Sequence, residues 1–418
     1  MFTKKRIMQA VTVSLAAGML LSGCSAGSSS SGGREQLTFW GPWSGDQVAQ
    51  INQMTKKYNA SQTKYTVKYT AQSSAMEQKL LTSMAAGDSP DVVLWDSFNT
   101  STYAPKGALQ PLNDLIKKDK IDTSTYYPAA LDQLKYDGKT YGLPLVSDVR
   151  ALVYNKTMLK DAGITTLPTT WDELLADAKK MTVYKNGKLE KSGFSLQGVG
   201  FFQMFLWQAG GESVSKDGKK ATFNSAQGLE VLNFWKQLLD NHIYENGYDT
   251  NTDEFSAGNV AMKIDAPWDI PTLDKSGVDY GFAELPAGPT GIKASQTGGF
   301  GLVIPKGAKH ADGAWDFIKW FAANKDNELA FCKIAQWLPA DTEVAKDAYW
   351  KSEKWTPFIK SLEYARPRPT ITGWSDASSK TLDPALQQFM AGRLTAKQAL
   401  NQAESQINPL LEKAAANQ

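Results

Sequence analysis

Strand and helix signals alternate along residues 36–95, and this alternation limits the possible folds more than any other feature of the sequence. Residues 36–40 (QLTFW) and 65–70 (YTVKYT) have the β-branched and aromatic content of strands, and apolar residues recur at helical spacing through residues 48–58. After a second predicted helix, residues 91–95 (DVVLW) suit a buried strand. The order β-α-β-α-β predicts an α/β fold in which helices cover both faces of a sheet with parallel strands.

The chain is too long for one ordinary hydrophobic core. It has 418 residues, and domains usually contain roughly 100 to 200. Its composition, 42% hydrophobic and 21% charged, is that of a folded protein. We therefore expect at least two domains.

Two segments suggest where the chain passes from one domain to the other. Residues 135–141 place Asp137-Gly138 between two short β-compatible runs, which is a strong hairpin signal, and residues 143–148 then lead into a strand at residues 151–155. A glycine cluster at residues 297–301 runs into a second apolar strand. We expect the chain to cross between domains at both places.

The N-terminus has the pattern of an export signal. Lys4, Lys5 and Arg6 precede an uncharged apolar stretch over residues 7–21. A membrane-spanning helix is the alternative, but about 15 residues are fewer than the roughly 20 needed to cross a bilayer. Leu21-Ser22-Gly23-Cys24 resembles the lipobox of bacterial lipoproteins, so Cys24 is predicted to become the lipid-modified first residue on the outer face of a membrane.

The segment that follows Cys24 has the composition of a flexible tether, since residues 25–33 (SAGSSSSGG) contain nothing to bury. The only other cysteine, Cys332, lies in an apolar sequence and is predicted to be buried. Removing the signal changes the formal net charge from +2 to −1. Because no basic run remains to attract a phosphate backbone, nucleic-acid binding is not expected.

Several ordered motifs resemble those of one family. Pro144-Leu145-Val146, four further residues, and then Ala151-Leu152-Val153-Tyr154-Asn155-Lys156-Thr157-Met158-Leu159-Lys160-Asp161 look like the signature of the bacterial extracellular solute-binding proteins, family 1, which include maltose- and multiple-sugar-binding proteins. Residues 86–92 (AGDSPDV), residues 258–268 (GNVAMKIDAPW) and Gly298-Gly299 are similar to further landmarks of that family. The resemblance covers essentially the whole mature chain.

The resemblance implies a two-lobed periplasmic-binding-protein fold with discontinuous lobes and a hinge. Residues 1–23 would be the lipoprotein signal peptide and residues 24–35 the lipidated cysteine and tether. Residues 36–147 and 298–340 would form the N-terminal lobe, and residues 148–297 and 341–418 the C-terminal lobe. The expected function is that of a monomeric, lipid-anchored binding protein of an ABC importer, which captures a sugar or oligosaccharide between its lobes and delivers it to the permease.

The chemistry of sugars indicates which side chains a sugar-binding cleft should contain. Their C–H faces stack on aromatic rings, and their hydroxyls need acceptors and bidentate donors. Ligands of open α/β sheets lie at the carboxyl ends of strands, where several of these residue types occur. The predicted ligand-binding residues are Trp43, Trp95, Asp96, Asp148, Arg150, Asp265, Trp268, Gly298, Gly299, Trp337 and Trp374.

Each of these residues also has a purely structural interpretation. Trp43, beside Gly and Pro, could equally cap a helix, and Trp337 and Trp374 could equally be structural, whereas Trp268 and Asp96 favour the cleft. Arg366 and Arg368, between prolines, could reach the cleft but are interpreted as solvated. Six further tryptophans are expected to pack in the core or at the surface: Trp207, Trp235, Trp315, Trp320, Trp350 and Trp355.

Catalytic and cofactor motifs are missing from the sequence. His242 and His310 stand alone, and there is no HExxH, paired cysteine, G-x-S-x-G or P-loop pattern. No metal, cofactor or enzymatic activity is therefore expected. Two alternatives stay open: the same fold binding an amine, a polyol phosphate or a peptide, and a secreted carbohydrate-active enzyme with paired carboxylates.

Overall fold

The structure is a computed structural model that describes residues 33–72, 74–249 and 252–416. The predicted signal peptide, Cys24 and most of the predicted tether lie outside the described residues. Within the described residues, no helix is long and apolar enough to cross a membrane.

The first three strands of the chain, which belong to the larger sheet, follow the predicted alternation of strands and helices. Strand β1 (Glu35–Gly41) pairs in parallel with β2 (Tyr65–Ala71) on one side and with β3 (Val92–Asp96) on the other. Helices α1 (Asp46–Ser61) and α2 (Met76–Ala85) connect them. The β-α-β-α-β prediction is confirmed.

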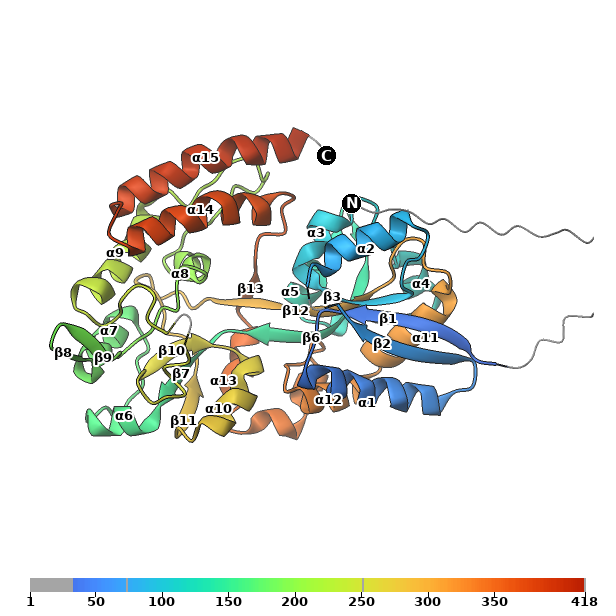
Figure 1. The fold of residues 1–418 in the computed structure, drawn as a ribbon, viewed down its shortest axis with the longest axis horizontal. Helices are drawn as coiled ribbons and strands as arrows, with labels where there is room; N and C mark the ends of the chain where they lie inside the picture. The colour runs from blue at the N-terminus through green and yellow to red at the C-terminus, as the bar shows by residue number, and fades with distance from the viewer. Residues whose placement is uncertain (1–32, 73, 250–251, 417–418) are drawn as a thin grey trace, which may run out of the picture.

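Three further strands complete this six-stranded sheet and extend beyond it toward the rest of the molecule (Figure 1). Strand β12 (Ser295–Val303) is antiparallel to β3 and to β6 (Gly142–Val149), and parallel to β13 (Ala365–Pro367). In Figure 1, β6, β12 and β13 lie between two groups of elements. These three strands therefore connect the two halves of the molecule.

A smaller antiparallel sheet forms the centre of the second group. Strand β7 (Ala151–Asn155) lies between β10 (Met262–Asp265) and β11 (Tyr280–Ala283). The other elements of this group are α6 (Lys156–Asp161), α7 (Trp171–Met181), β8 (Val183–Lys185), β9 (Lys188–Lys191), α8 (Phe202–Gln208), α9 (Ala226–Asp240), α10 (Ile270–Ser276), α14 (Trp374–Met390) and α15 (Ala396–Ala416).

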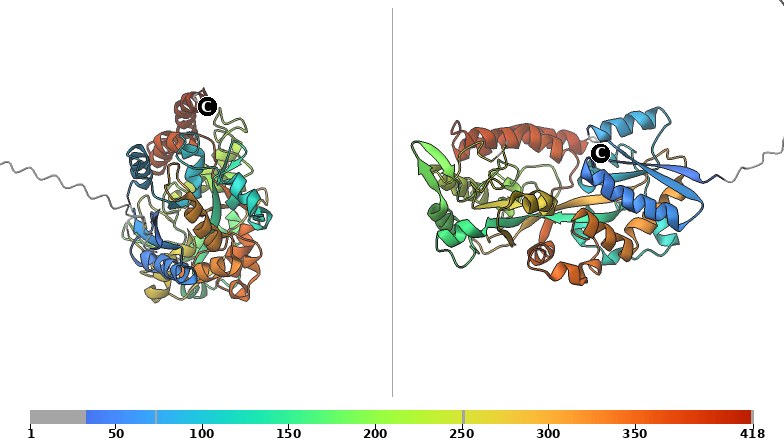
Figure 2. Two further views of the ribbon diagram at one scale, coloured as in Figure 1. Left: turned by 90° about the vertical axis from the view of Figure 1, so that its right-hand side faces the viewer. Right: turned by 60° about the horizontal axis from the view of Figure 1, so that its bottom comes forward.

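The views of Figure 2 place α14 and α15 on one outer side of the molecule and the helices of residues 325–362 on the opposite side. The remaining helices are α3 (Thr100–Tyr103), α4 (Asn113–Lys118), α5 (Pro128–Asp132), α11 (Ala311–Ala322), α12 (Lys325–Ala335) and α13 (Thr356–Leu362).

The predicted hairpin is present. Strands β4 (Lys135–Tyr136) and β5 (Lys139–Thr140) pair antiparallel across Asp137 and Gly138, whose φ angles are 47° and 69°. Both turn residues thus adopt the left-handed conformation that the Asp-Gly pair favours.

The two groups share packed interior where they meet. The largest apolar cluster contains Leu37 and Phe317 from the first group together with Val153 and Phe282 from the second, and Phe358 of α13 packs among them. The predicted lobe boundaries at residues 147/148 and 297/298 fall inside β6 and β12, and they remain predictions, as does the boundary after residue 340.

Candidate functional site

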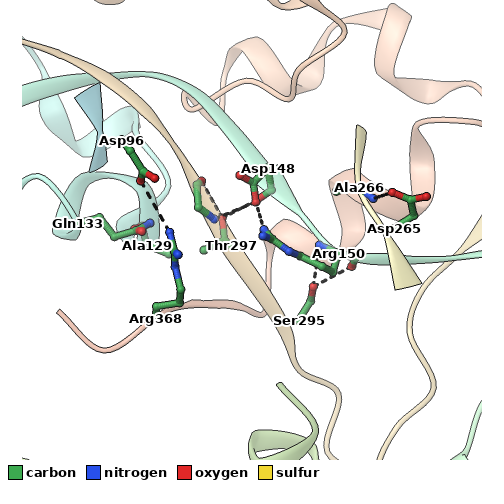
Figure 3. A network of polar contacts seen from close by, with 11 residues as sticks. Asp96, Ala129, Gln133, Asp148, Arg150, Asp265, Ala266, Ser295, Thr297 and Arg368 are labelled. Atoms are coloured by element: carbon green, nitrogen blue, oxygen red, sulfur yellow. Dashed lines mark hydrogen bonds and ion pairs between the residues drawn. The ribbon is translucent and has the colours of Figure 1, made fainter. Parts of the chain in front are cut away.

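Asp148 of β6 links this strand to β12 where the two groups meet. Its carboxylate accepts a hydrogen bond from the backbone N–H of Gly298 at 3.0 Å and forms an ion pair with Arg150 (Figure 3). The backbone N–H of Arg150 donates to Ser295 Oγ at 3.1 Å. Asp148 and Arg150, both predicted site residues, therefore lie together at the start of β12.

Gly298 and Gly299 are buried in this strand pair, and their predicted contact with a ligand stays a prediction. Gly299 has φ of +144°, and a Cβ placed on it would lie 2.2 Å from the carbonyl oxygen of Val146. Gly299 therefore allows β6 and β12 to approach each other closely, which is a structural role, whereas a Cβ on Gly298 would meet only the Asp148 side chain.

Four aromatic residues stack beside this strand pair. Trp43 lies 5.2 Å from Trp337 and 5.7 Å from Phe331, measured between ring centroids, and Trp337 lies 5.9 Å from Trp268. Trp43 and Trp337 are buried, whereas Trp268 keeps 41% of its surface exposed. The first two therefore act as support, and Trp268 is the member of the stack that offers surface to a ligand.

Arg150 lies over the ring of Trp268, with its guanidinium carbon 4.8 Å from the ring centroid. A cation in this position is attracted to the negative face of the indole. Because Arg150 is also paired with Asp148, the three predicted residues Asp148, Arg150 and Trp268 form one connected group.

Trp95 is a correction to the predicted site. Its side chain is completely buried, its ring packs edge-on against Tyr103, and its indole N–H donates to Thr100 Oγ1 at 3.2 Å. Trp95 therefore belongs to a small core beneath α3 and has no surface for a ligand.

Asp96, the next residue, lies at the end of β3 with a partly exposed carboxylate. It accepts a hydrogen bond from the backbone N–H of Phe98 at 3.1 Å, and Arg368 Nη2 lies 3.7 Å away. Burial raises the pKa of Asp96, and the opposing charge of Arg368 limits the rise. The guanidinium carbon of Arg368 also lies 3.9 Å from the centroid of the Phe98 ring.

Arg368 thus reaches the place where the two groups meet, contrary to the interpretation of this residue as solvated (Figure 3). Its Nε atom is buried without a hydrogen-bond partner among the described residues. Arg366, only two residues earlier, pairs instead with Glu212 at 2.7 Å and lies over Trp207.

Asp265 is held in a buried ion cluster. Lys263 Nζ lies 3.0 Å from Asp265 and 3.4 Å from Asp269, and the Asp265 carboxylate accepts the backbone N–H of Ala266 at 2.8 Å. Its predicted contact with a ligand stays a prediction. These contacts do fix the turn η3 (Pro267–Asp269), which carries Trp268.

Burial raises the pKa of Asp265 to about 7, with Lys263 opposing the rise and Asp269 adding to it. The folded-state pKa lies above the unfolded value of about 4. Protonated Asp265 therefore contributes to the free energy of unfolding fully below about pH 4, and this contribution is lost as the pH rises to about 7. Between pH 5 and pH 8 we expect this group to lower the free energy of unfolding by about 1 to 3 kcal/mol.

Asp265→Asn should therefore flatten the decrease in unfolding free energy between pH 5 and pH 8, measured by urea denaturation. Asp253→Asn is the matched control, because Asp253 lies 4.0 Å from the same amine but is far more exposed. Parallel curves for wild type and Asp265→Asn would contradict this assignment.

A cavity of about 220 Å³ lies between the two groups beside Arg368. One wall comes from Phe98, Gln296 and Arg368, and the other from the start of α8 and one face of α14. Its lining residues are Phe98, Val199, Gly200, Phe202, Gln203, Gln296, Arg368, Trp374, Ser375, Ser378, Ser379, Leu382 and Asp383.

Of the predicted site residues, only Trp374 lines this cavity, and most of its side chain packs in the core of the second group. Gln203, Gln296, Ser375 and Asp383 were not predicted. Polar residues on helices and mid-strand carry no distinguishing pattern in a single sequence, so no signal marked them.

A larger hollow of about 530 Å³ is lined by residues of α10, β11 and the segment 352–354, and it includes none of the predicted site residues. The smaller cavity adjoins the ends of the connecting strands, where binding sites of open α/β sheets occur. We therefore take the smaller cavity as the candidate cleft. Asp96 contacts its lining residue Arg368, whereas Asp148, Arg150 and Trp268 form a connected group that is not part of the lining.

Comparisons with known proteins agree with this architecture. The model of the family described as bacterial extracellular solute-binding protein matches residues 53–357. The maltodextrin-binding protein MdxE of Bacillus subtilis is 28% identical over 322 residues, 72% of this chain and 73% of that protein. A maltooligosaccharide ABC transporter solute-binding lipoprotein of Streptococcus pneumoniae is 27% identical over 357 residues, 80% of this chain and 79% of that protein.

Among solved structures, the cyclic α-maltosyl-1,6-maltose binding protein of Arthrobacter globiformis aligns with a TM-score of 0.81 at 26% identity, covering 91% of this chain and 100% of that one. Two packed α/β groups joined by connecting strands are the periplasmic-binding-protein fold, as the sequence predicted. The chain belongs to the bacterial extracellular solute-binding protein family. By its family it is an extracellular solute-binding protein and not an enzyme.

Proposed function

We propose that this protein captures a neutral oligosaccharide, most simply a maltodextrin, in the cleft beside Arg368 and delivers it to the permease of an ABC importer. The observation that carries the proposal is the composition of the cavity. Amide, hydroxyl and guanidinium groups of Gln203, Gln296, Ser375 and Arg368 line it, and these are the groups that sugar hydroxyls require, whereas the neighbouring rings of Phe98 and Trp374 are buried.

Unpartnered polar atoms in the cavity wall support the same function. Arg368 Nε and Gln203 Nε2 are buried without a hydrogen-bond partner among the described residues. Such donors are costly to leave unsatisfied, but neither atom is exposed to solvent in this structure, so a ligand hydroxyl would reach them only after these side chains move; the Arg368 side chain as a whole is 33% exposed and lines the cavity. The names of the relatives above, which refer to maltodextrin and maltooligosaccharide, favour glucose oligosaccharides.

Attachment through Cys24 to the outer face of the bacterial membrane is part of this proposal. The lipobox pattern supports it, and one relative is itself called a lipoprotein. The tether would let the cleft reach both solute and permease.

Purified protein should be stabilised by maltotriose or longer maltodextrins, by about 2.7 kcal/mol at 100 times the dissociation constant. Arg368→Ala should weaken binding about 10- to 100-fold, because it removes charge-assisted hydrogen bonds to the ligand. Arg366→Ala is the matched control and should bind like wild type.

Small-angle scattering should show compaction on binding if the lobes close over the ligand.

Equal losses of affinity in Arg366→Ala and Arg368→Ala would place the site elsewhere. Failure of every saccharide in a broad panel to shift the melting temperature would contradict the proposed function itself.

A further inference from the structure

One face of α14 supplies a polar wall to the cleft. Ser375, Ser379 and Asp383 recur at four-residue spacing, which places them on the same side of the helix, and all three line the cavity. The hydroxyl of Ser378 donates to the carbonyl oxygen of Ser375 at 3.2 Å, and that of Ser379 to the carbonyl oxygen of Asp376 at 3.1 Å. The lone pairs of the Ser378 and Ser379 hydroxyl oxygens remain available to accept hydrogen bonds.

Asp383 differs from the other charged groups near the cleft. Arg368 is matched by Asp96, and Arg150 by Asp148. No hydrogen bond or ion pair reaches the carboxylate of Asp383 from any residue that the structure describes. It is partly buried, and burial alone raises its pKa, with no neighbouring cation to oppose the rise.

The cavity therefore contains one uncompensated charge, and that charge is negative. Beside the donor-bearing side chains of Arg368 and Gln203, its lining contains one strong acceptor without a partner among the described residues, Asp383. A sugar hydroxyl both donates and accepts, so it satisfies both kinds of group. A ligand carboxylate or phosphate can only accept, and near Asp383 it would bring together two like charges.

We propose that Asp383 determines the charge class of the ligand: it accepts hydrogen bonds from neutral or amine-bearing saccharides and disfavours acidic saccharides and sugar phosphates. This inference rests on the proposed function, because it assigns specificity within the same cleft. Asp383→Asn tests it, since the amide keeps the shape of the side chain and removes the charge. Asp376→Asn is the matched control, because Asp376 lies on the same helix but is exposed, pairs with Lys380 at 3.6 Å and does not line the cavity.

Calorimetry would compare maltotriose and mannotriose (neutral), the chitosan trisaccharide (amine-bearing) and trigalacturonate (acidic) on wild type and both variants. We expect wild type to prefer neutral or amine-bearing probes over trigalacturonate. Asp383→Asn should weaken the preferred probes about 10-fold or more and reduce the discrimination against trigalacturonate by a similar factor. Asp376→Asn should match wild type.

A pH series separates this role from a structural one. Because burial raises the pKa of Asp383, lowering the pH should protonate its carboxylate and lower the affinity of wild type for the neutral probe toward that of Asp383→Asn, whose own affinity should change much less. An unchanged ratio of neutral to acidic affinities in Asp383→Asn, or a wild type that prefers trigalacturonate, would overturn the inference while leaving the proposed function standing. If no saccharide binds wild type, the proposed function itself fails.

Discussion

Gly299→Ala is expected to destabilise the protein by about 3 kcal/mol or more, measured by urea denaturation. The φ angle of +144° at this position is one that residues with a Cβ rarely adopt, and the added methyl would lie 2.2 Å from the carbonyl oxygen of Val146. This contact is with backbone, so relief requires β6 and β12 to separate. Both strands connect the two halves of the molecule, which makes such a shift expensive.

Gly298→Ala is the control for this prediction. A Cβ at Gly298 would meet only the carboxylate of Asp148, at 3.0 Å, and its φ angle is not in the left-handed region. A side chain can move where a strand cannot, so we expect a loss of about 1 kcal/mol or less. Equal losses in the two variants would show that the close approach of the strands is not the limiting contact.

These glycines also show what the sequence could not reveal. A Gly-Gly pair before an apolar strand fits a backbone that approaches a ligand and fits equally a backbone that approaches another strand. Only the partner strand, more than 140 residues away in the chain, decides between them. Local features were more predictable: the Asp137-Gly138 turn and the first parallel strands depend on neighbouring residues alone.

Arg366 in β13 and Arg368, just after its end, give a second example. In a continuing strand Arg366 and Arg368 would point to the same face, because alternate residues share a side. The strand ends at Pro367, and the two guanidinium groups go to different partners, Glu212 and Asp96. Asp383 could not be found at all from sequence, because a serine- and aspartate-bearing helix face looks the same whether it faces water or a cleft.

Trp95 and Trp268 allow the core and the cleft to be distinguished by experiment. Trp95→Ala should lower the free energy of unfolding by about 3 to 5 kcal/mol, since it removes a fully buried indole and leaves a cavity beside Tyr103. Trp95→Phe should lose less, because a phenyl ring still fills much of the space, although part of the indole volume and the hydrogen bond to Thr100 are removed. Ligand affinity of the folded Trp95 variants should be close to that of wild type.

Trp268→Ala should show the opposite pattern. Its side chain is 41% exposed, so its loss should change the free energy of unfolding of the ligand-free protein by about 1 kcal/mol or less. The loss of an aromatic platform should instead weaken sugar binding by about 2 to 4 kcal/mol. Calorimetry with the bound sugar, together with denaturation of the ligand-free variants, measures both quantities. Unchanged affinity with a large loss of stability in Trp268→Ala would mean that this indole supports the stack of Trp43 and Trp337 and does not bind the ligand.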